Sequence, residues 1–323
     1  MSKNILVSGA CGLLGYGVLK SLRRSETPYK LIGTSIYEYE DSVAPKFCDI
    51  VLQVPLTLSK GFKDKLLKII LEYEIDLIIP TFEIGVTFWA ENSDLLKKTG
   101  TKVVTNNPDL IRLCNDKWEF YKVMKHHNSP YVIPTTLCSD FNELDGKFGL
   151  PLLIKPRHGM ASRGIVRVYD QRSFELHKEE IGKKLMVQPL IGKDDGEYTV
   201  GAFCDGKGGY DAIIIFKRYL SKEGYTNKAE VVEDKQIEAA VLELCKIFEP
   251  VGPTNFQFRV HEGVYHLLEI NPRFSASTAI RSAFGYNEAL MAVEYYLDGK
   301  SPKQPKIRKG KAIRYIEEHI FYS

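Results

Sequence analysis

The chain has 323 residues, of which 44% are hydrophobic and 26% are charged, and its formal net charge is +3. These values are typical of a globular enzyme built from two or three structural units. The longest uncharged stretch, residues 4–19, is too short to cross a bilayer, which excludes a membrane-spanning protein. Only Arg23-Arg24 follows that stretch, and no small-residue cleavage site does, so it does not resemble a signal peptide. We expect a cytoplasmic protein with no membrane partner.

Six cysteines are scattered along the chain without a Cys-x-x-Cys pair or a cysteine–histidine cluster of zinc spacing. They predict reduced thiols rather than disulfides. The positive charge is concentrated in residues 299–312, where six basic residues occur and no acidic one. A nucleic-acid-binding patch is one interpretation of this segment. Because it contains two prolines and no aromatic residue, we expect a solvated connector and no nucleic-acid partner.

Short apolar runs alternate with helical patterns over the first hundred residues. Such alternation predicts parallel strands joined by crossover helices in an open, doubly wound sheet. The segment Asn106-Asn107-Pro108 then interrupts the pattern and is typical of a helix start. We therefore predict a Rossmann-like α/β domain over residues 1–107. Its predicted strands are 4–8, 30–33, 51–54, 76–80 and 102–104, and its predicted helices are 13–24, 60–73 and 86–98.

Strands joined by short turns dominate the remainder of the chain, which predicts an α+β domain with antiparallel sheets over residues 108–323. A hairpin is expected around His261-Glu262-Gly263. The predicted helices are 109–127 and 235–248. The predicted strands are 152–155, 165–169, 186–188, 198–205, 212–219, 255–260 and 265–270.

A glycine loop, Gly9 to Gly15, follows the first predicted strand with the spacing GxxGxxG of short-chain reductases and sugar-nucleotide epimerases. An NAD(P)-dependent enzyme is therefore the main rival interpretation. Against it, the second strand runs into Thr34-Ser35-Ile36 without an acidic residue for a ribose. The two Tyr-x-x-x-Lys pairs, at Tyr16 and Tyr121, are unsuitably placed.

The same loop has two other interpretations. It either turns the chain for packing alone, or it helps to hold the second substrate through Gly12. Glu83 follows the strand that ends at Pro80, and ligands bind beyond the carboxyl ends of parallel strands. We predict that Glu83 contacts substrate, with a solvated loop carboxylate as the alternative.

A second glycine loop, Gly159 to Gly164, follows a very apolar strand that ends in Lys155. Backbone N–H groups beside a lysine suit a polyphosphate, and Ser162 lies inside the loop. The loop is not a P-loop, because Ile165-Val166 replace the required Lys and Ser/Thr; an ordinary hairpin turn is the alternative. Beyond the loop lies an edge strand that contains Gln188 and Pro189. The next two residues, Leu190 and Ile191, offer backbone groups to an adenine. Glu197 follows and is suited to ribose hydroxyls.

The segment Glu269-Ile270-Asn271-Pro272-Arg273 carries the strongest signal of the chain, because Glu269 and Asn271 point to one face of a strand. With a hairpin centred on Glu262, Glu269 faces Asn255 and lies diagonally beside Gln257; a tighter turn would change this register. Gln257, Glu269 and Asn271 then offer oxygen ligands of modest charge, which suit Mg²⁺ bound to nucleotide phosphates. Arg273 is placed to clamp a transferred phosphoryl group or a substrate carboxylate. A capped strand end with a surface salt bridge is the alternative.

The order of these parts resembles the ATP-grasp superfamily. It is most similar to one ATP-binding half of the carbamoyl phosphate synthetase large subunit and to single-copy carboxylate–amine ligases such as the one in pyrrolysine biosynthesis. The segments Gly252 to Gln257 and Glu269 to Thr278 carry the resemblance. It implies a pre-ATP-grasp domain (1–107) and an ATP-grasp domain (108–323) with a lid subdomain at about 115–190.

The resemblance also implies residue roles. Lys117, within Asn-Asp-Lys-Trp, and Lys155 would contact ATP phosphates under the loop from Gly159 through Ser162 to Gly164. Gln188, Leu190 and Ile191 would meet adenine and Glu197 the ribose, although Pro189 and the additional residues 193–195 depart from the family pattern. Gln257, Glu269 and Asn271 would bind Mg²⁺, with Mn²⁺ as an alternative, and Arg273 would lie near the transferred phosphate. Lys217-Arg218 faces the cleft in this scheme without a matched role.

The implied activity is that of an ADP-forming ligase that joins a carboxylate to an amine, or to a thiol, through an acyl phosphate, with Lys155 and Arg273 as catalytic residues. The expected cofactors are ATP and Mg²⁺, the expected partners are small molecules, and a homodimer is compatible with the resemblance. A non-catalytic ATP-binding protein is a further alternative. A single ATP-grasp unit without a glutaminase nucleophile argues against carbamoyl phosphate synthesis by this chain alone.

Overall fold

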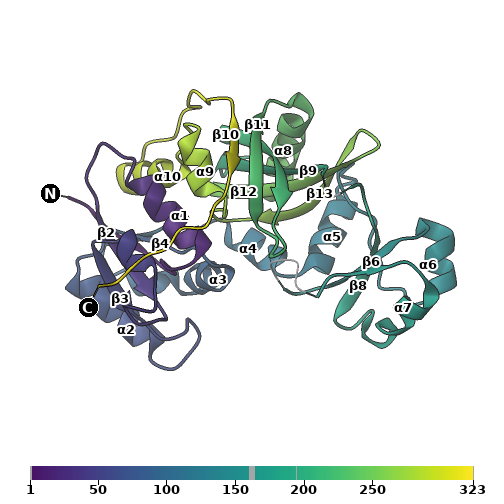
Figure 1. Ribbon diagram of the computed structural model, residues 1–323, viewed down its shortest axis with the longest axis horizontal. Coiled ribbons are helices and arrows are strands. Elements are labelled where there is room, and N and C mark those ends of the chain that lie inside the picture. The colour runs from purple at the N-terminus through teal and green to yellow at the C-terminus, as the bar shows by residue number, and fades with distance from the viewer. Residues whose placement is uncertain (1, 160–163, 194, 323) are drawn as a thin grey trace.

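The computed structural model describes residues 2–159, 164–193 and 195–322, which form three sheets (Figure 1). A five-stranded parallel sheet has the order β3-β2-β1-β4-β5, a six-stranded antiparallel sheet the order β13-β12-β9-β10-β11-β14, and a three-stranded antiparallel sheet the order β7-β6-β8. The predicted fold class, a parallel α/β sheet followed by antiparallel sheets, is confirmed. No helix of the described residues is long and apolar enough to cross a membrane.

The N-terminal sheet follows the predicted alternation, with small changes at the ends of elements. The last predicted helix, 86–98, instead begins at Glu83, so this residue belongs to the first turn of a helix and not to a loop. The elements are β1 (Asn4–Val7), α1 (Leu13–Leu22), β2 (Lys30–Ser35), β3 (Ile50–Gln53), α2 (Phe62–Glu72), β4 (Leu77–Ile79), α3 (Glu83–Asn92) and β5 (Lys102–Val103), with short 3₁₀ turns at Ala44–Lys46 and Ser93–Leu96.

The predicted helix 109–127 is in fact two helices, α4 (Pro108–Cys114) and α5 (Lys117–His126). The division occurs at Asp116, whose carboxylate accepts hydrogen bonds from the backbone N–H groups of Trp118 and Glu119. An N-cap aspartate starts a new helix because it satisfies donors that have no partner within the helix. The interruption sets Lys117 at the first position of α5.

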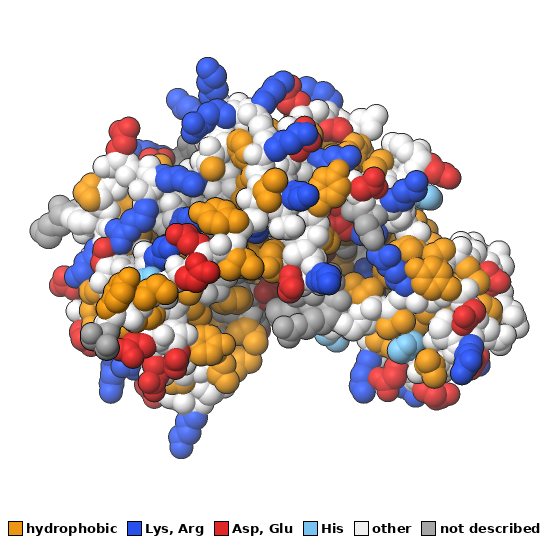
Figure 2. Space-filling model, viewed as in Figure 1, with side chains coloured by type: hydrophobic (Ala, Val, Ile, Leu, Met, Phe, Trp, Pro, Cys, Tyr) orange, Lys and Arg blue, Asp and Glu red, His pale blue; other side chains and the backbone are white. Residues whose placement is uncertain are grey.

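The three-stranded sheet forms a small unit with its own hydrophobic core, which includes Leu144, Ile154 and Phe174. This unit projects from the rest of the molecule in Figure 1, and Figure 2 shows it as a separate lobe. It lies within the segment predicted to be a lid, and its motion stays a prediction. Its elements are α6 (Phe141–Phe148), β6 (Leu152–Pro156), β7 (Val166–Val168), α7 (Gln171–Glu175), a 3₁₀ turn at Lys178–Glu180 and β8 (Leu185–Pro189).

The six-stranded sheet carries two strands that the sequence analysis did not predict, β11 and β14. β14 begins inside the basic segment expected to be a solvated connector and pairs with β11 at Lys311 and Ala312, so that expectation is wrong for its last residues. The predicted helix 235–248 is confirmed at both ends. The elements are β9 (Glu197–Asp205), β10 (Tyr210–Leu220), β11 (Thr226–Val232), α8 (Lys235–Phe248), β12 (Val251–His261), β13 (Val264–Asn271), α9 (Thr278–Ala283), α10 (Glu288–Asp298) and β14 (Lys311–Ile313).

One hydrophobic cluster contains residues from both sides of residue 107. This cluster of buried side chains includes Val18 and Leu19 of α1. It also includes Tyr286, which precedes α10, and Ala292 within α10. Figure 1 shows α9 and α10 beside α1, and it shows the C-terminal segment running from β14 to the N-terminal unit. There Glu317 forms an ion pair with Lys46 at 3.0 Å. The domain boundary at 107/108 stays a prediction.

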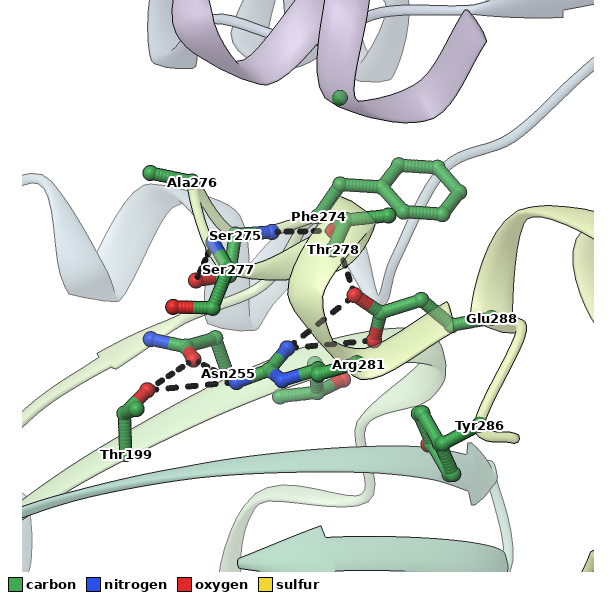
Figure 3. A network of polar contacts seen from close by, with 12 residues as sticks. Thr199, Asn255, Phe274, Ser275, Ala276, Ser277, Thr278, Arg281, Tyr286 and Glu288 are labelled. Atoms are coloured by element: carbon green, nitrogen blue, oxygen red, sulfur yellow. Dashed lines mark hydrogen bonds and ion pairs between the residues drawn. The ribbon is translucent and has the colours of Figure 1, made fainter. Parts of the chain in front are cut away.

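A buried polar network connects this helical layer to the large sheet (Figure 3). Arg281, with no exposed surface, donates to both oxygens of Glu288 at 3.1 and 3.2 Å and to Oδ1 of Asn255 at 2.5 Å. A side chain at Gly201 would lie 2.6 Å from the guanidinium carbon, so glycine is required there for this close approach. The network therefore fixes α9 over β9 and β12.

We expect Arg281→Met to lower the free energy of unfolding by about 3–5 kcal/mol, because it leaves the Glu288 carboxylate buried without its cation. Urea unfolding measures this loss. Asp94→Asn, which breaks an exposed ion pair with Lys97, is the matched control and should change stability by less than about 0.5 kcal/mol. Equal effects of the two substitutions would contradict the role given to the network.

Gly15 lets α1 pack directly on the turn after β1. A Cβ at Gly15 would lie 2.1 Å from the carbonyl oxygen of Gly9, whereas a Cβ at Gly17 on the same helix would meet nothing closer than 3.8 Å. We expect Gly15→Ala to destabilise the protein by about 3 kcal/mol or more, because backbone must move. Gly17→Ala should be neutral or stabilising by up to about 1 kcal/mol. Urea unfolding of both variants tests this contrast, and a stable Gly15→Ala protein would refute the packing role.

Candidate functional site

A cavity of about 470 Å³ lies where the three sheets approach one another. In Figure 2 the outline of the molecule is indented between the N-terminal unit and the small lobe. Most of the residues predicted for the site line the cavity, although they come from distant parts of the chain. They are Glu83, Lys117, Lys155, Gly159, Gln188, Gln257, Glu269, Asn271 and Arg273.

Five other predicted residues do not line the cavity. Among the described residues these are Gly12, Gly164, Leu190, Ile191 and Glu197, although Leu13 and Leu14, which follow Gly12, do line it. Ser162 lies outside the described residues.

The predicted register of the hairpin is wrong, yet its predicted ligands do converge. The turn is the tighter two-residue form, Glu262-Gly263, with positive φ at both positions. By itself that turn would place Glu269 opposite Phe256, on the other face from Gln257. A β-bulge at Leu268 adds one residue to β13 and restores the parity, so Gln257 pairs with Glu269 and Asn255 with Asn271.

The three predicted metal ligands fit a magnesium ion in their donor chemistry. Gln257, Glu269 and Asn271 present one carboxylate and two amide oxygens from adjacent strands, which is a low-charge oxygen set. In the structure these groups hold one another: Asn271 Nδ2 donates to Glu269 Oε1 at 2.9 Å, and Gln257 Oε1 accepts from Arg218 Nη2 at 2.5 Å. Among the described residues, neither this face nor any other place holds a cluster of three His, Cys, Asp or Glu side chains suited to a metal.

Two lysines, one from α5 and one from β6, line the same cavity and interact with the charge of Glu269. Lys117 Nζ donates to the carbonyl oxygen of Gly159 at 2.7 Å, which ties α5 to the second glycine loop. Burial lowers the pKa of Lys117, while Glu269 opposes the change. Burial also lowers the pKa of Lys155 to about 8, and repulsion from Lys117 adds to the effect. Two partly desolvated ammonium groups that repel each other favour a polyanion between them.

Arg273 reaches from the end of β13 to the N-terminal unit. Its Nη2 forms an ion pair with Oε1 of Glu83 and donates to Oδ1 of Asn271 at 3.0 Å, and its Nη1 donates to the carbonyl oxygen of Phe274. Glu83, Arg273, Asn271 and Glu269 thus form one continuous polar chain across the cavity. The predicted substrate residue and the predicted phosphate clamp are direct partners.

Glu197 has a different position from the one predicted for a ribose ligand. Its side chain is 3% exposed and its carboxylate forms ion pairs with Arg218, at 3.1 Å, and with Arg259. Arg218, left without a role by the sequence, lines the cavity and joins this carboxylate to Gln257. The geometry therefore favours a structural role for Glu197 in orienting Arg218.

The predicted adenine region is partly occupied by protein contacts. The backbone N–H of Leu190 donates to the carbonyl oxygen of Pro151 at 3.1 Å, and the carbonyl oxygen of Ile191 accepts from Arg259. Gln188 Nε2 donates to Oγ1 of Thr135. An apolar wall at this end of the cavity was not predicted, because its residues are scattered over four elements and one connecting segment: Ile111, Phe120, Met124, Ile133, Met186 and Leu267.

The first glycine loop is covered by an aromatic ring. A Cβ at Gly9 would lie 2.2 Å from Cε2 of Phe82, and a Cβ at Gly12 would lie 2.5 Å from its Cζ. The glycines therefore make room for the ring of Phe82, which precedes α3 and lines the cavity. This packing explains the GxxGxxG spacing without a dinucleotide.

The C-terminal segment forms hydrogen bonds with residues that line the cavity. Arg314, which the sequence analysis did not single out, donates through Nε to the carbonyl oxygen of Thr226 at 2.6 Å and through Nη2 to that of Ala276. Both acceptor residues line the cavity. Only pairing of β14 with β11 brings Arg314 there, so no local sequence signal marks it.

Comparison with known proteins identifies relatives over most of the chain. Residues 182–319 match the family model described as ATP-grasp in the biosynthetic pathway with Ter operon. The C-terminal section of the carbamoyl phosphate synthase large chain of Methanocaldococcus jannaschii is 26% identical over 222 residues, which cover 64% of this chain and 36% of that protein. The large chain of Lachnoclostridium phytofermentans is 25% identical over 301 residues, which cover 85% of this chain and 27% of that protein. The chain thus spans well under two thirds of these relatives.

The fold has matching solved structures as well. A crystal structure of a biotin carboxylase–β,γ-ATP complex from Campylobacter jejuni superposes with a TM-score of 0.73 at 18% identity, and the match covers 96% of this chain and 74% of that one. The shared fold, the family model and the sequence relatives agree. Residues 182–319 thus match an ATP-grasp family model, and the chain is similar in sequence to carbamoyl phosphate synthase large chains and in fold to a biotin carboxylase.

Proposed function

We propose that this protein is an ADP-forming ligase that activates a carboxylate with ATP and transfers the acyl group to an amine, with a thiol as the alternative acceptor. The observation that carries the proposal is the convergence, in one cavity, of two lysines with the Gln257–Glu269–Asn271 face. Cations and oxygen ligands in one cavity match the two requirements of a metal-bound nucleotide, which are charge neutralisation and metal coordination.

In this proposal each part of the cavity has one task. The apolar wall, with Met186 and Leu267, receives the adenine ring, and Gln188 lies at its edge. Lys117 and Lys155 hold phosphates beside Gly159. Gln257, Glu269 and Asn271 hold Mg²⁺, or Mn²⁺, which when bound neutralises charge on the phosphates.

The chemistry then needs positioning more than a protein nucleophile. A carboxylate oxygen of the substrate attacks the γ-phosphorus, the bond to the β-phosphate oxygen breaks, and ADP leaves. The amine next attacks the acyl carbon, and inorganic phosphate leaves with the bonding electrons. Arg273 orients the acid and stabilises the negative charge that develops.

The same observations weigh against the other candidates. The ring of Phe82 against Gly9 and Gly12 argues against an NAD(P)-dependent reductase. A non-catalytic ATP-binding protein would not need Arg273 beside the metal ligands. We further propose that the small lobe is a lid, that the protein acts on small molecules in the cytoplasm, and that a homodimer is the assembly to test.

We expect Mg·ATP to raise the thermal unfolding midpoint of the wild-type protein, because a ligand at about a hundred times its dissociation constant adds about 2.7 kcal/mol. The shift should shrink with ATP plus a chelator, and it should be lost in Lys155→Ala, which removes a phosphate contact. Glu269→Gln should lose the metal-dependent part alone. Differential scanning fluorimetry measures all three.

NADPH is the comparison ligand, and Lys122→Ala, an exposed lysine of α5, is the matched control. Lys122→Ala should behave as the wild type. A shift with NADPH and none with Mg·ATP would overturn the proposal and return the first glycine loop to a cofactor role. Release of phosphate from ATP then serves to screen carboxylate and amine pairs.

The affinity for Mg·ATP should fall as the pH rises through about 8, the pKa of Lys155. Below that pH the free protein already carries the ammonium that phosphates require, and above it binding must take up a proton. The dissociation constant should therefore rise by up to about tenfold per pH unit.

Lys155→Arg is the control, because a guanidinium stays charged up to a pH of about 12. Most of the pH dependence should disappear in that variant. Calorimetric titrations at several pH values test both proteins, and an affinity of the wild type that is constant from about pH 7 to 9.5 would contradict the position given to Lys155.

A further inference from the structure

The ion pair between Glu83 and Arg273 lines the cavity and is partly buried. The Arg273 side chain is 13% exposed and that of Glu83 25%. Glu83 comes from the first turn of α3, whereas Arg273 follows β13, so the pair joins the N-terminal sheet to the ligand-bearing strand. Among the described residues Glu83 is the only carboxylate within ion-pair distance of Arg273.

The guanidinium is incompletely used by this contact. Glu83 engages Nη2 through a single oxygen, and the Nε group of Arg273 is buried without a hydrogen-bond partner among the described residues. A carboxylate that bound Nε and Nη2 together would form the two-pronged contact that arginine and carboxylates prefer. Glu83 thus uses the Nη2 donor of this contact and leaves the Nε donor unused.

Release of Glu83 from Arg273 would leave it in a favourable place. It is the first residue of α3, and a negative charge at a helix N-terminus is stabilised by the unpaired N–H groups and the helix dipole. The buried guanidinium, by contrast, requires an anion at all times. Glu83 can therefore be stabilised without Arg273, whereas Arg273 needs an anion in the place of Glu83.

We propose that Glu83 is an exchangeable partner of Arg273 that holds the place of the substrate carboxylate until the substrate displaces it. The inference rests on the proposed function for the identity of the incoming group, and it specifies that group as a planar carboxylate and not a phosphate. Glu83 thereby competes with the substrate acid and neutralises the charge of Arg273 when no acid is bound.

The test is the binding of acetate to the full-length protein without nucleotide, at constant ionic strength. The acetate dependence of the unfolding free energy gives its dissociation constant. Glu83→Gln should lower that constant about tenfold, because the competing charge is removed. Arg273→Gln should abolish the binding of acetate at this site. Arg273→Lys keeps the positive charge but lacks the paired N–H donors of the guanidinium, so it should not restore that binding.

Glu91→Gln, which removes an exposed carboxylate from the last turn of the same helix, is the matched control and should bind acetate as the wild type does. Inorganic phosphate is titrated in parallel, and its affinity should not depend on Glu83. An unchanged or weaker acetate affinity in Glu83→Gln would overturn the proposal. So would a rise in phosphate affinity alone, or full acetate binding in Arg273→Gln. Since no nucleotide is present, these outcomes are independent of whether the Mg·ATP experiment succeeds.

Discussion

The arrangement of the cavity depends on the parity of one hairpin. A two-residue turn at Glu262-Gly263 would direct Glu269 and Gln257 to opposite faces of the sheet, where they could not share a ligand. The additional residue at Leu268 returns both side chains to the cavity face and brings Asn271 with them. Because side chains alternate along a strand, a single inserted residue decides whether this surface carries oxygen ligands or apolar side chains.

Buried charge then links this surface to the other parts of the molecule. Asn255, opposite Asn271, is held by Arg281 from α9, and Gln257, opposite Glu269, is held by Arg218 from β10. Each arginine has a buried carboxylate partner, Glu288 or Glu197 respectively. Buried ion pairs of this kind contribute little net stability, but the loss of one member is costly, so they specify one arrangement of the strands beneath the cavity.

The first glycine loop illustrates how one motif can satisfy two different physical demands. Close approach of backbone groups requires glycine whether the neighbour is a pyrophosphate or a protein group. Here the neighbours are the ring of Phe82 at Gly9 and Gly12, and the carbonyl of Gly9 at Gly15. The spacing alone could not distinguish these cases, because Phe82 lies some seventy positions away in the sequence.

Local pattern by itself determined the two types of sheet, most strands and the ends of α8, since alternation and apolar periodicity are short-range properties. It also determined which chemical groups the cavity would hold, because Lys155, Glu269, Asn271 and Arg273 each lie within two residues of the end of a strand. Only the tertiary structure decided how these groups meet. No local signal marks the bulge at Leu268, which follows another leucine. The ion-pair partners of Glu197 and Glu83 come from other strands or from the end of one. The physical reason is that propensity acts over a few residues, whereas register, ion pairing and cavity shape are set by packing between distant segments.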